Sequence, residues 1–228
     1  MSSTPARIAP TRVWRRWDWA RPVRATRREQ LYVATSVEQP GVPVLFVPDV
    51  RDAGAAALQP WLLEAADRGH PAYAVSPRAT GGTARPGPRF AVALREWVHD
   101  VVQAACGLPT RCVLVGHGTG ALVVAHALHR YPAAAGVLIE PRGLPGHRFP
   151  GAGTLVTRPR LAARMLTGRD PRRAPTSPPL LVAGGAGYPA KVLDALAVRY
   201  GAESARLPGT GNVPGLAPVV DWLAGQAE

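Results

Sequence analysis

The sequence predicts an α/β protein whose sheet is doubly wound and mostly parallel. Short, uninterrupted apolar runs at residues 44–47 and 135–139 have the character of parallel strands buried on both faces. Segments with apolar residues at helical spacing lie between such runs, and this alternation is typical of a parallel sheet covered by helices. In a sheet of this kind a ligand site is expected at the carboxyl ends of the strands.

The elements follow from local patterns along the chain. Strands are predicted at residues 44–47, 72–75, 112–115, 135–139, 180–183 and 204–207, of which 44–47, 112–115 and 135–139 are expected to be buried, and edge strands are predicted at 14–19 and 31–35. Helices are predicted over residues 55–68, 90–105, 119–128 and 192–200, with a last one through Trp222. Because proline suits a first helical turn, the regular part of the first helix is expected to begin at Pro60. In the second, Asp100 lies off the apolar stripe.

Length and composition favour one domain. A chain of 228 residues with 46% hydrophobic content can bury a full core. We expect residues 1–10 to form a disordered lead and residues 11–228 to form a single domain. Cys106 and Cys112 have no metal-ligand spacing, and we expect both to be buried thiols of a reducing compartment.

The chain is basic, with a net charge of +12 from 27 basic residues, of which Lys191 is the only lysine. This arginine excess indicates either a bias in coding composition or contact with an anionic partner. Arginines cluster around Trp14, Trp17 and Trp19, a pattern suited to phosphate or lipid headgroups, but no nucleic-acid motif accompanies them. No apolar stretch reaches the length of a membrane span, so we expect a soluble, cytoplasmic protein.

Residues 111–132 contain a buried strand, a turn with Gly116, Gly118 and Gly120, and a helix that starts at Thr119. The stretch GHGTG resembles the G-x-S-x-G nucleophile elbow of the α/β-hydrolase family. The segments VLFVPD, LLVAGGAGYP and LPGTGNVPG stand in the family's order around it. The resemblance covers about residues 44–223. It implies the α/β-hydrolase fold of a lipase-like, esterase-like or lysophospholipase-like protein, with a short cap at about 141–179.

The resemblance also locates the positions where that family carries its serine, acid and histidine. In this chain they read Gly118, Gly187 and Asn212, and the His-Gly pair that shapes the family's oxyanion hole reads Pro48 and Asp49. We therefore expect a catalytically inactive protein, a pseudoenzyme retained for binding a small molecule or a protein. A glycine at the elbow also adopts positive φ without the steric cost that serine has.

Several side chains are candidates for a substitute role. Asp49, His117 and Glu140 are weak substitutes for the triad, and the alternative function is an active hydrolase or lyase with a non-serine mechanism. Thr119 is expected to cap its helix. If the oxyanion pocket survives as a ligand site, Asp49, Val50, Gly118 and Thr119 would line it. No cofactor or metal motif is present.

The expected partners follow from these features. A small molecule in the former active site is one, and a homo-oligomer or a hetero-oligomer with an active homologue is another. The arginine-rich and tryptophan-rich N-terminus is a candidate for docking on such a homologue or on an anionic membrane. We expect neither a nucleic-acid partner nor a transmembrane segment.

Overall fold

The computed structural model of the protein describes residues 28–49, 54–83, 92–144, 178–209 and 214–226. The predicted lead at 1–10, the edge strand at 14–19 and nearly all of the predicted cap lie outside these residues. Val50 and Asn212 also lie outside them.

Seven strands form one sheet in the order β1-β3-β2-β4-β5-β6-β7. Strand β1 runs antiparallel to β3, and every other pairing is parallel. The strands are β1 (Gln30–Val33), β2 (Val44–Val47), β3 (Ala72–Val75), β4 (Val113–His117), β5 (Ala135–Ile139), β6 (Leu180–Gly184) and β7 (Glu203–Arg206). The predicted mostly parallel, doubly wound sheet is therefore confirmed. The strand expected at 112–115 begins and ends later along the chain, so it includes His117.

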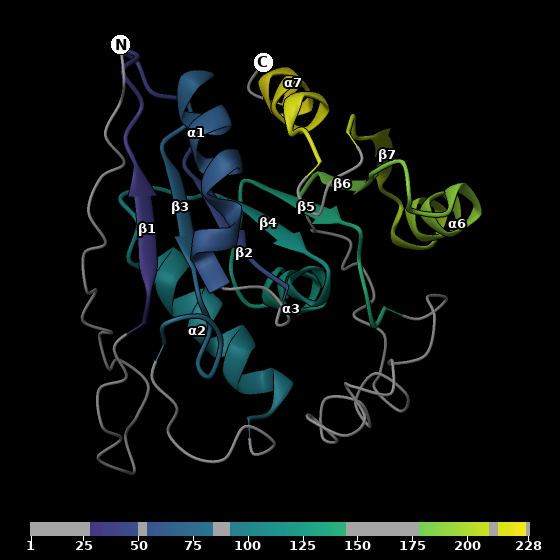
Figure 1. Ribbon diagram of the computed structural model, residues 1–228, viewed down its shortest axis with the longest axis horizontal. Coiled ribbons are helices and arrows are strands. Elements are labelled where there is room, and N and C mark those ends of the chain that lie inside the picture. The colour runs from purple at the N-terminus through teal and green to yellow at the C-terminus, as the bar shows by residue number, and fades with distance from the viewer. Residues whose placement is uncertain (1–27, 50–53, 84–91, 145–177, 210–213, 227–228) are drawn as a thin grey trace.

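Helices cover both faces of this sheet (Figure 1). They are the 3-10 helix η1 (Gly54–Leu58), α1 (Gln59–Asp67), α2 (Leu94–Cys106), α3 (Thr119–Ala127), α6 (Ala190–Tyr200) and α7 (Ala217–Gly225). Alternate strand residues point to opposite faces, so Leu45 packs in the core beneath α2, α3 and α6, and Phe46 packs in the core beneath α1 and α7. None of the helices among the described residues combines the length and the apolar character that crossing a bilayer requires.

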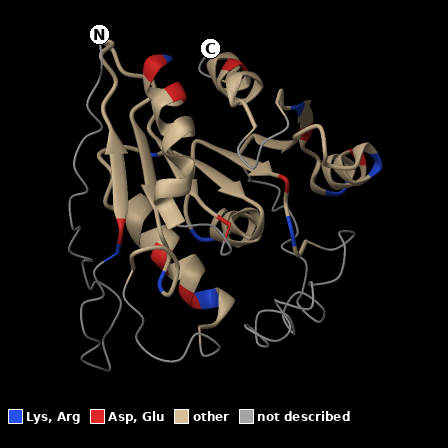
Figure 2. Cartoon of the chain, in the orientation of Figure 1, with Lys and Arg blue, Asp and Glu red and all other residues tan. Residues whose placement is uncertain are grey.

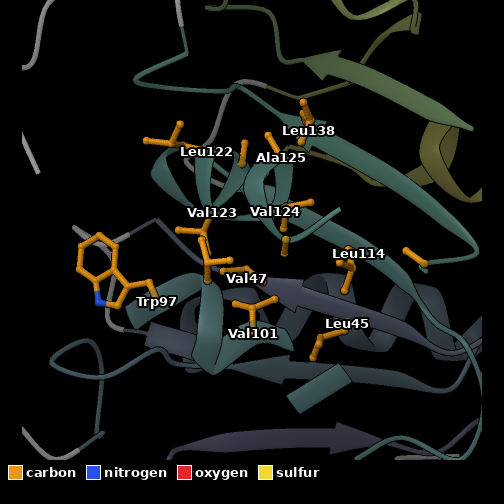
Figure 3. Packing of buried hydrophobic residues seen from close by; sticks show 14 of the residues in the cluster. Leu45, Val47, Trp97, Val101, Leu114, Leu122, Val123, Val124, Ala125 and Leu138 are labelled. Atoms are coloured by element: carbon orange, nitrogen blue, oxygen red, sulfur yellow. The ribbon is translucent and has the colours of Figure 1, made fainter. Parts of the chain in front are cut away.

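The larger core lies between the sheet and helices α2 and α3 (Figure 3). Trp97 and Val101 of α2 pack there with Val123 of α3 and with Leu45 and Leu114 of the sheet. All five are at most 2% exposed. Burying a large apolar side chain contributes roughly 1.5–3 kcal/mol, so this cluster holds α3, and with it the turn before α3, firmly against β4.

Two helices differ from their predicted form. Helix α2 begins at Leu94 rather than at residue 90, because Ala93 is extended and its N–H donates to the Glu96 carboxylate at 2.7 Å. Helix α3 ends at Ala127 instead of at residue 128, and all nine of its residues except His126 are buried. The reason is its position between the sheet and α2, which removes both sides of the helix from solvent.

Asp100 of α2 is fully buried although it lies off the apolar stripe. Its Oδ1 atom accepts from Arg28 at 2.7 Å and from Arg78 at 2.6 Å. The main-chain N–H and Nε of Arg78 both donate to Oδ2 at 2.9 Å. One carboxylate thus ties the residues before β1 and after β3 to α2, and its burial depends on two arginines that are distant in sequence.

The direction in which strands are added to the sheet reverses between β2 and β4. After β2 the chain adds β3 on one side and then crosses to β4 on the other side of β2. Ligands of open α/β sheets bind where the strand order reverses, outside the carboxyl ends of the strands. Asp49 follows β2 and Gly118 follows β4, so these two residues lie on either side of this point.

Candidate functional site

The turn between β4 and α3 consists of Gly118 alone, because β4 ends at His117 and α3 begins at Thr119. Gly118 has φ 56° and ψ −117°, a conformation that side chains rarely adopt. The positive φ expected at this position is therefore confirmed. Two residues later, the chain passes so close to β2 that a Cβ on Gly120 would lie 2.6 Å from the carbonyl oxygen of Pro48. The glycines make this sharp turn possible.

The carboxylate of Asp49 fills the space beside Gly118. Asp49 is 1% exposed. A Cβ atom built on Gly118 would collide with its Oδ2 and would lie 2.7 Å from Cγ and 2.9 Å from Cβ of Asp49. These separations are far below van der Waals contact. Asp49 therefore takes up the volume in which any side chain at position 118 would begin.

Two donors from the described part of the chain contribute to holding this carboxylate in place. The Thr119 hydroxyl donates to Oδ1 of Asp49 at 2.8 Å, and Nη1 of Arg142 donates to Oδ2 at 3.1 Å. Thr119 was expected to cap its helix, but the N-cap position of α3 is Gly118, and the hydroxyl of Thr119 donates to Asp49. A hydrogen bond to a carboxylate is stronger than one to a neutral acceptor.

Arg142 comes from the segment after β5. Its main-chain N–H donates to the carbonyl oxygen of Gly118 at 2.9 Å, while its side chain, about a third exposed, reaches Asp49. Arg142 was not among the site residues predicted from the sequence. A basic side chain three residues beyond the end of a strand that neighbours the elbow strand was a usable indication, because parallel strands end at a common edge.

His117 and Glu140 meet on neighbouring strands of the same edge. The His117 ring packs edge-on against Trp61 with 5.3 Å between centroids, and its Nε2 lies 4.0 Å from Oε2 of Glu140. Glu140 has φ 44°, which is unusual for a residue other than glycine, and its Oε1 accepts from the N–H of Gly185 at 3.2 Å. The three substitute candidates therefore divide into a His117–Glu140 pair and a separate Asp49 carboxylate.

The turn after β6 contains Gly187, the position that the resemblance assigns to the family's acid. Apart from its two chain neighbours, no heavy atom of the described residues lies within 4 Å of a Cβ built on Gly187. Because β4 and β6 are both parallel to β5, Gly118 and Gly187 follow the carboxyl ends of their strands at the same edge of the sheet. Gly187 has open space in front of it, whereas Gly118 faces Asp49.

The strands of this region carry almost no charge of their own. Figure 2 shows β2, β4 and β5 in tan, so the charges at the edge come from residues that follow the strands. Tyr188 lies near them and donates to the carbonyl oxygen of Pro141 at 2.9 Å. Burial raises the pKa of Tyr188, and the nearby Glu140 carboxylate raises it further, so this phenol stays neutral. Within the described part of the chain no three His, Cys, Asp or Glu residues gather as a metal site would require.

No family model and no curated protein matches the chain. Solved structures do match over nearly its whole length. An esterase from Thermogutta terrifontis, solved with malate bound, has a TM-score of 0.65 and 18% identity, with 99% of this chain and 100% of the esterase covered. The chain has the α/β-hydrolase fold.

Two further structures with this fold have similar scores. An α/β hydrolase from Sphaerobacter thermophilus has a TM-score of 0.62 and 13% identity, with 89% of this chain and 97% of that one covered. A protein from Agrobacterium vitis S4, provisionally assigned as a hydrolase, has a TM-score of 0.67 and 15% identity, with 99% and 100% covered. At these identities the similarity establishes the α/β-hydrolase fold alone, and the function has to be argued from the site.

Proposed function

We propose that this α/β-hydrolase-fold protein is not a serine hydrolase and that its former catalytic edge serves to bind a ligand. One observation carries the proposal: the carboxylate of Asp49 lies where the side chain of a nucleophile at position 118 would begin. Position 118 has no hydroxyl, and a neighbouring acid excludes one. Loss of such a nucleophile lowers turnover by about a millionfold in a serine hydrolase.

The charge at the elbow supports the same proposal. Acyl transfer needs donors that stabilise a developing oxyanion beside the nucleophile. Here a carboxylate, accepting from Thr119 and Arg142, lies beside the first residue of α3 instead. The negative charge of Asp49 would oppose the negative charge that develops on an oxyanion beside position 118. The Thr119 hydroxyl and the Arg142 guanidinium already donate to Asp49.

The test is an assay of the purified protein with short-chain p-nitrophenyl esters, together with labelling by a fluorophosphonate probe. We expect neither saturable turnover nor covalent labelling. A Gly118→Ser variant tests the steric part of the proposal, because its loss of stability should be smaller when Asp49 is also replaced by glycine. Turnover by the natural chain that survives removal of trace contaminants would overturn the proposal.

The His117–Glu140 pair favours a second candidate, a hydrolase or lyase that activates water. A carboxylate near an imidazole is the arrangement of a general base with its orienting acid. The positive φ of Glu140 is a further reason to consider it, since strained backbone often accompanies functional sites. If this candidate holds, any measured turnover should fall in both His117→Ala and Glu140→Gln, whereas His129→Ala, at an exposed position, should leave it unchanged.

A further inference from the structure

The excess positive charge of the chain does not belong to the residues that the structure describes. These residues hold 10 of the 27 basic side chains and 11 of the 15 acidic ones, so their formal net charge is −1. Figure 2 shows both signs on the helices of this part. The net charge of +12 therefore comes from the remaining segments. A bias in coding composition adds arginine over the whole surface, so this uneven distribution favours contact with an anionic partner.

Residues 1–27 combine positive charge with aromatic side chains. The segment holds seven arginines against one acidic residue, and it holds three of the six tryptophans of the chain, Trp14, Trp17 and Trp19. Tryptophan is enriched where proteins meet the interface between membrane and water, and each arginine near an anionic bilayer contributes about 1 kcal/mol of binding. Residues 145–177 also hold seven arginines against one acidic residue but contain no tryptophan. The composition of residues 1–27 thus favours a lipid surface over a nucleic acid.

The described part of the chain shows where this N-terminal segment is attached. Strand β1 is antiparallel to β3, and Gln30 at its start pairs with Val75, the last residue of β3. The start of β1 therefore lies at the edge of the sheet where the parallel strands end. Asp49 and Gly118 lie at the same edge, because each follows the carboxyl end of its strand. The N-terminal segment is attached beside the candidate site.

Arg28 fixes this point of attachment. Its side chain is 3% exposed, and its Nη2 lies 2.7 Å from Oδ1 of Asp100. Its Nη1 donates to the main-chain carbonyl oxygen of Asp100 at 3.0 Å, and its Nη2 donates to Gln103 at 2.6 Å. Both partners belong to α2, so the residue that follows the N-terminal segment is held in the core of the domain. A surface bound by the segment is therefore kept close to this edge of the sheet.

We propose that residues 1–27 dock the protein on an anionic membrane surface, with the edge that carries Asp49 and Gly118 turned toward the lipid. Arginine supplies the attraction to anionic headgroups, and tryptophan supplies the contact with the interface. The inference goes beyond the proposed function and does not depend on it, because docking is compatible with binding and with catalysis at this edge.

The test is co-sedimentation of the natural protein with two kinds of vesicle, one of phosphatidylcholine and one of an equal mixture of phosphatidylcholine and phosphatidylserine. We expect binding to the mixed vesicles and little binding to the others. Binding should weaken as the salt concentration rises from about 0.01 M to about 0.15 M, since the screening length falls from about 30 Å to about 8 Å.

Two variants with equal loss of charge show which arginines are responsible. The first carries four changes in the N-terminal segment, R12Q, R15Q, R16Q and R21Q. The matched control carries four changes at exposed positions of the described residues, R95Q, R111Q, R130Q and K191Q. The first should bind the mixed vesicles at least about tenfold more weakly than the natural protein, and the control should bind them about as well.

Thiol labelling tests the orientation on the vesicle. Cys106 is exposed at the end of α2, shortly before β4 begins, and so lies at the opposite edge of the sheet. It should stay reactive in the bound protein. In C106S/G187C the exposed thiol follows β6 at the docking edge and should become protected. Equal binding to both kinds of vesicle, equal losses in the two charge variants, tighter binding to a DNA duplex, or equal protection of the two thiols would overturn the inference.

Discussion

The carboxylate of Asp49 and a side chain on residue 118 cannot occupy the structure together, since a Cβ on Gly118 would lie 2.7 Å from Cγ of Asp49. Asp49 follows β2 and Gly118 follows β4, so two groups that are 69 positions apart in the sequence fill one small volume. The absence of a nucleophile and the presence of this acid are therefore linked through packing.

This link predicts a coupling that unfolding measurements can detect. Gly118→Ala should destabilise the natural protein by about 1–3 kcal/mol, the usual cost of overpacking. In Asp49→Gly the same change should cost at least about 1 kcal/mol less, because the colliding carboxylate is gone. Urea unfolding of the four proteins in the cycle gives both values. Gly187→Ala is the control and should stay within about 0.5 kcal/mol, since its Cβ meets no atom of the described residues beyond its chain neighbours. Equal costs in both backgrounds would contradict the steric link.

The hydroxyl of Thr119 should contribute to stability through Asp49 and not through the helix. Thr119→Val keeps the shape but removes the donor to a buried carboxylate, so we expect a loss of about 1–3 kcal/mol. Thr119→Ser retains the hydroxyl and should lose clearly less. Urea unfolding of both variants compares them directly. A similar loss in the two would indicate that the methyl group, and not the hydrogen bond, matters at this position.

The buried carboxylate of Asp100 should be one of the most sensitive positions of the fold. Asp100→Ala leaves Arg28 and Arg78 without their buried partner, so the free energy of unfolding should fall by about 3–5 kcal/mol. Asp221→Ala is the matched control, because Asp221 pairs with Arg68 while its side chain is 77% exposed. It should change stability by no more than about 1 kcal/mol. Chemical denaturation measures the free energy of unfolding of both variants. Equal losses in Asp100→Ala and Asp221→Ala would refute this expectation.

The two cysteines should differ in reactivity, because Cys106 is exposed and only Cys112 is buried. The expectation that both are buried is wrong for Cys106, which ends α2 at the surface. Burial raises the pKa of Cys112 from 9.0 to about 12, and the N–H of Cys112 donates to the hydroxyl of Tyr131 at 3.2 Å. At about pH 8 a thiol reagent should label one cysteine in the native protein and both after unfolding.

The same shift has a consequence for stability at high pH. The folded protein keeps the Cys112 proton to a higher pH than the unfolded chain does. The contribution of this thiol is therefore complete below about pH 9 and is lost as the pH rises toward about 12. Cys112→Ser or Cys112→Ala should flatten the decline of stability in this range. If stability declines just as steeply in the alanine variant, the decline at high pH comes from ionisable groups other than Cys112.

Much of the fold could be predicted because it depends on local patterns. The runs at β2, β3 and β5 are apolar without interruption, so burial on both faces follows from composition. The regular part of the first helix was predicted to begin at Pro60, and α1 begins one residue earlier, at Gln59, after the 3-10 helix η1, with Pro60 in its first turn. Likewise, the positive φ of Gly118 follows from a glycine placed between a strand and a helix.

The contacts of the site could not be predicted in the same way. Arg142 reaches Asp49 across 93 positions of sequence, and Arg78 reaches Asp100 across 22. Neither contact produces a periodic pattern in the sequence. The partner of each side chain depends on which strand ends lie next to each other in the folded sheet. The pairing of His117 with Glu140 depends likewise on the register of β4 against β5.

The sequence by itself determined the alternating architecture, the glycine elbow and the absence of a hydroxyl at position 118, since each of these depends on the type and spacing of neighbouring residues. Only the tertiary structure decided what stands in place of that hydroxyl. The carboxylate of Asp49 reaches Gly118 because β2 and β4 are adjacent in the sheet although β3 separates them in the chain. Adjacency of this kind arises from long-range strand pairing, which no local stretch of residues encodes.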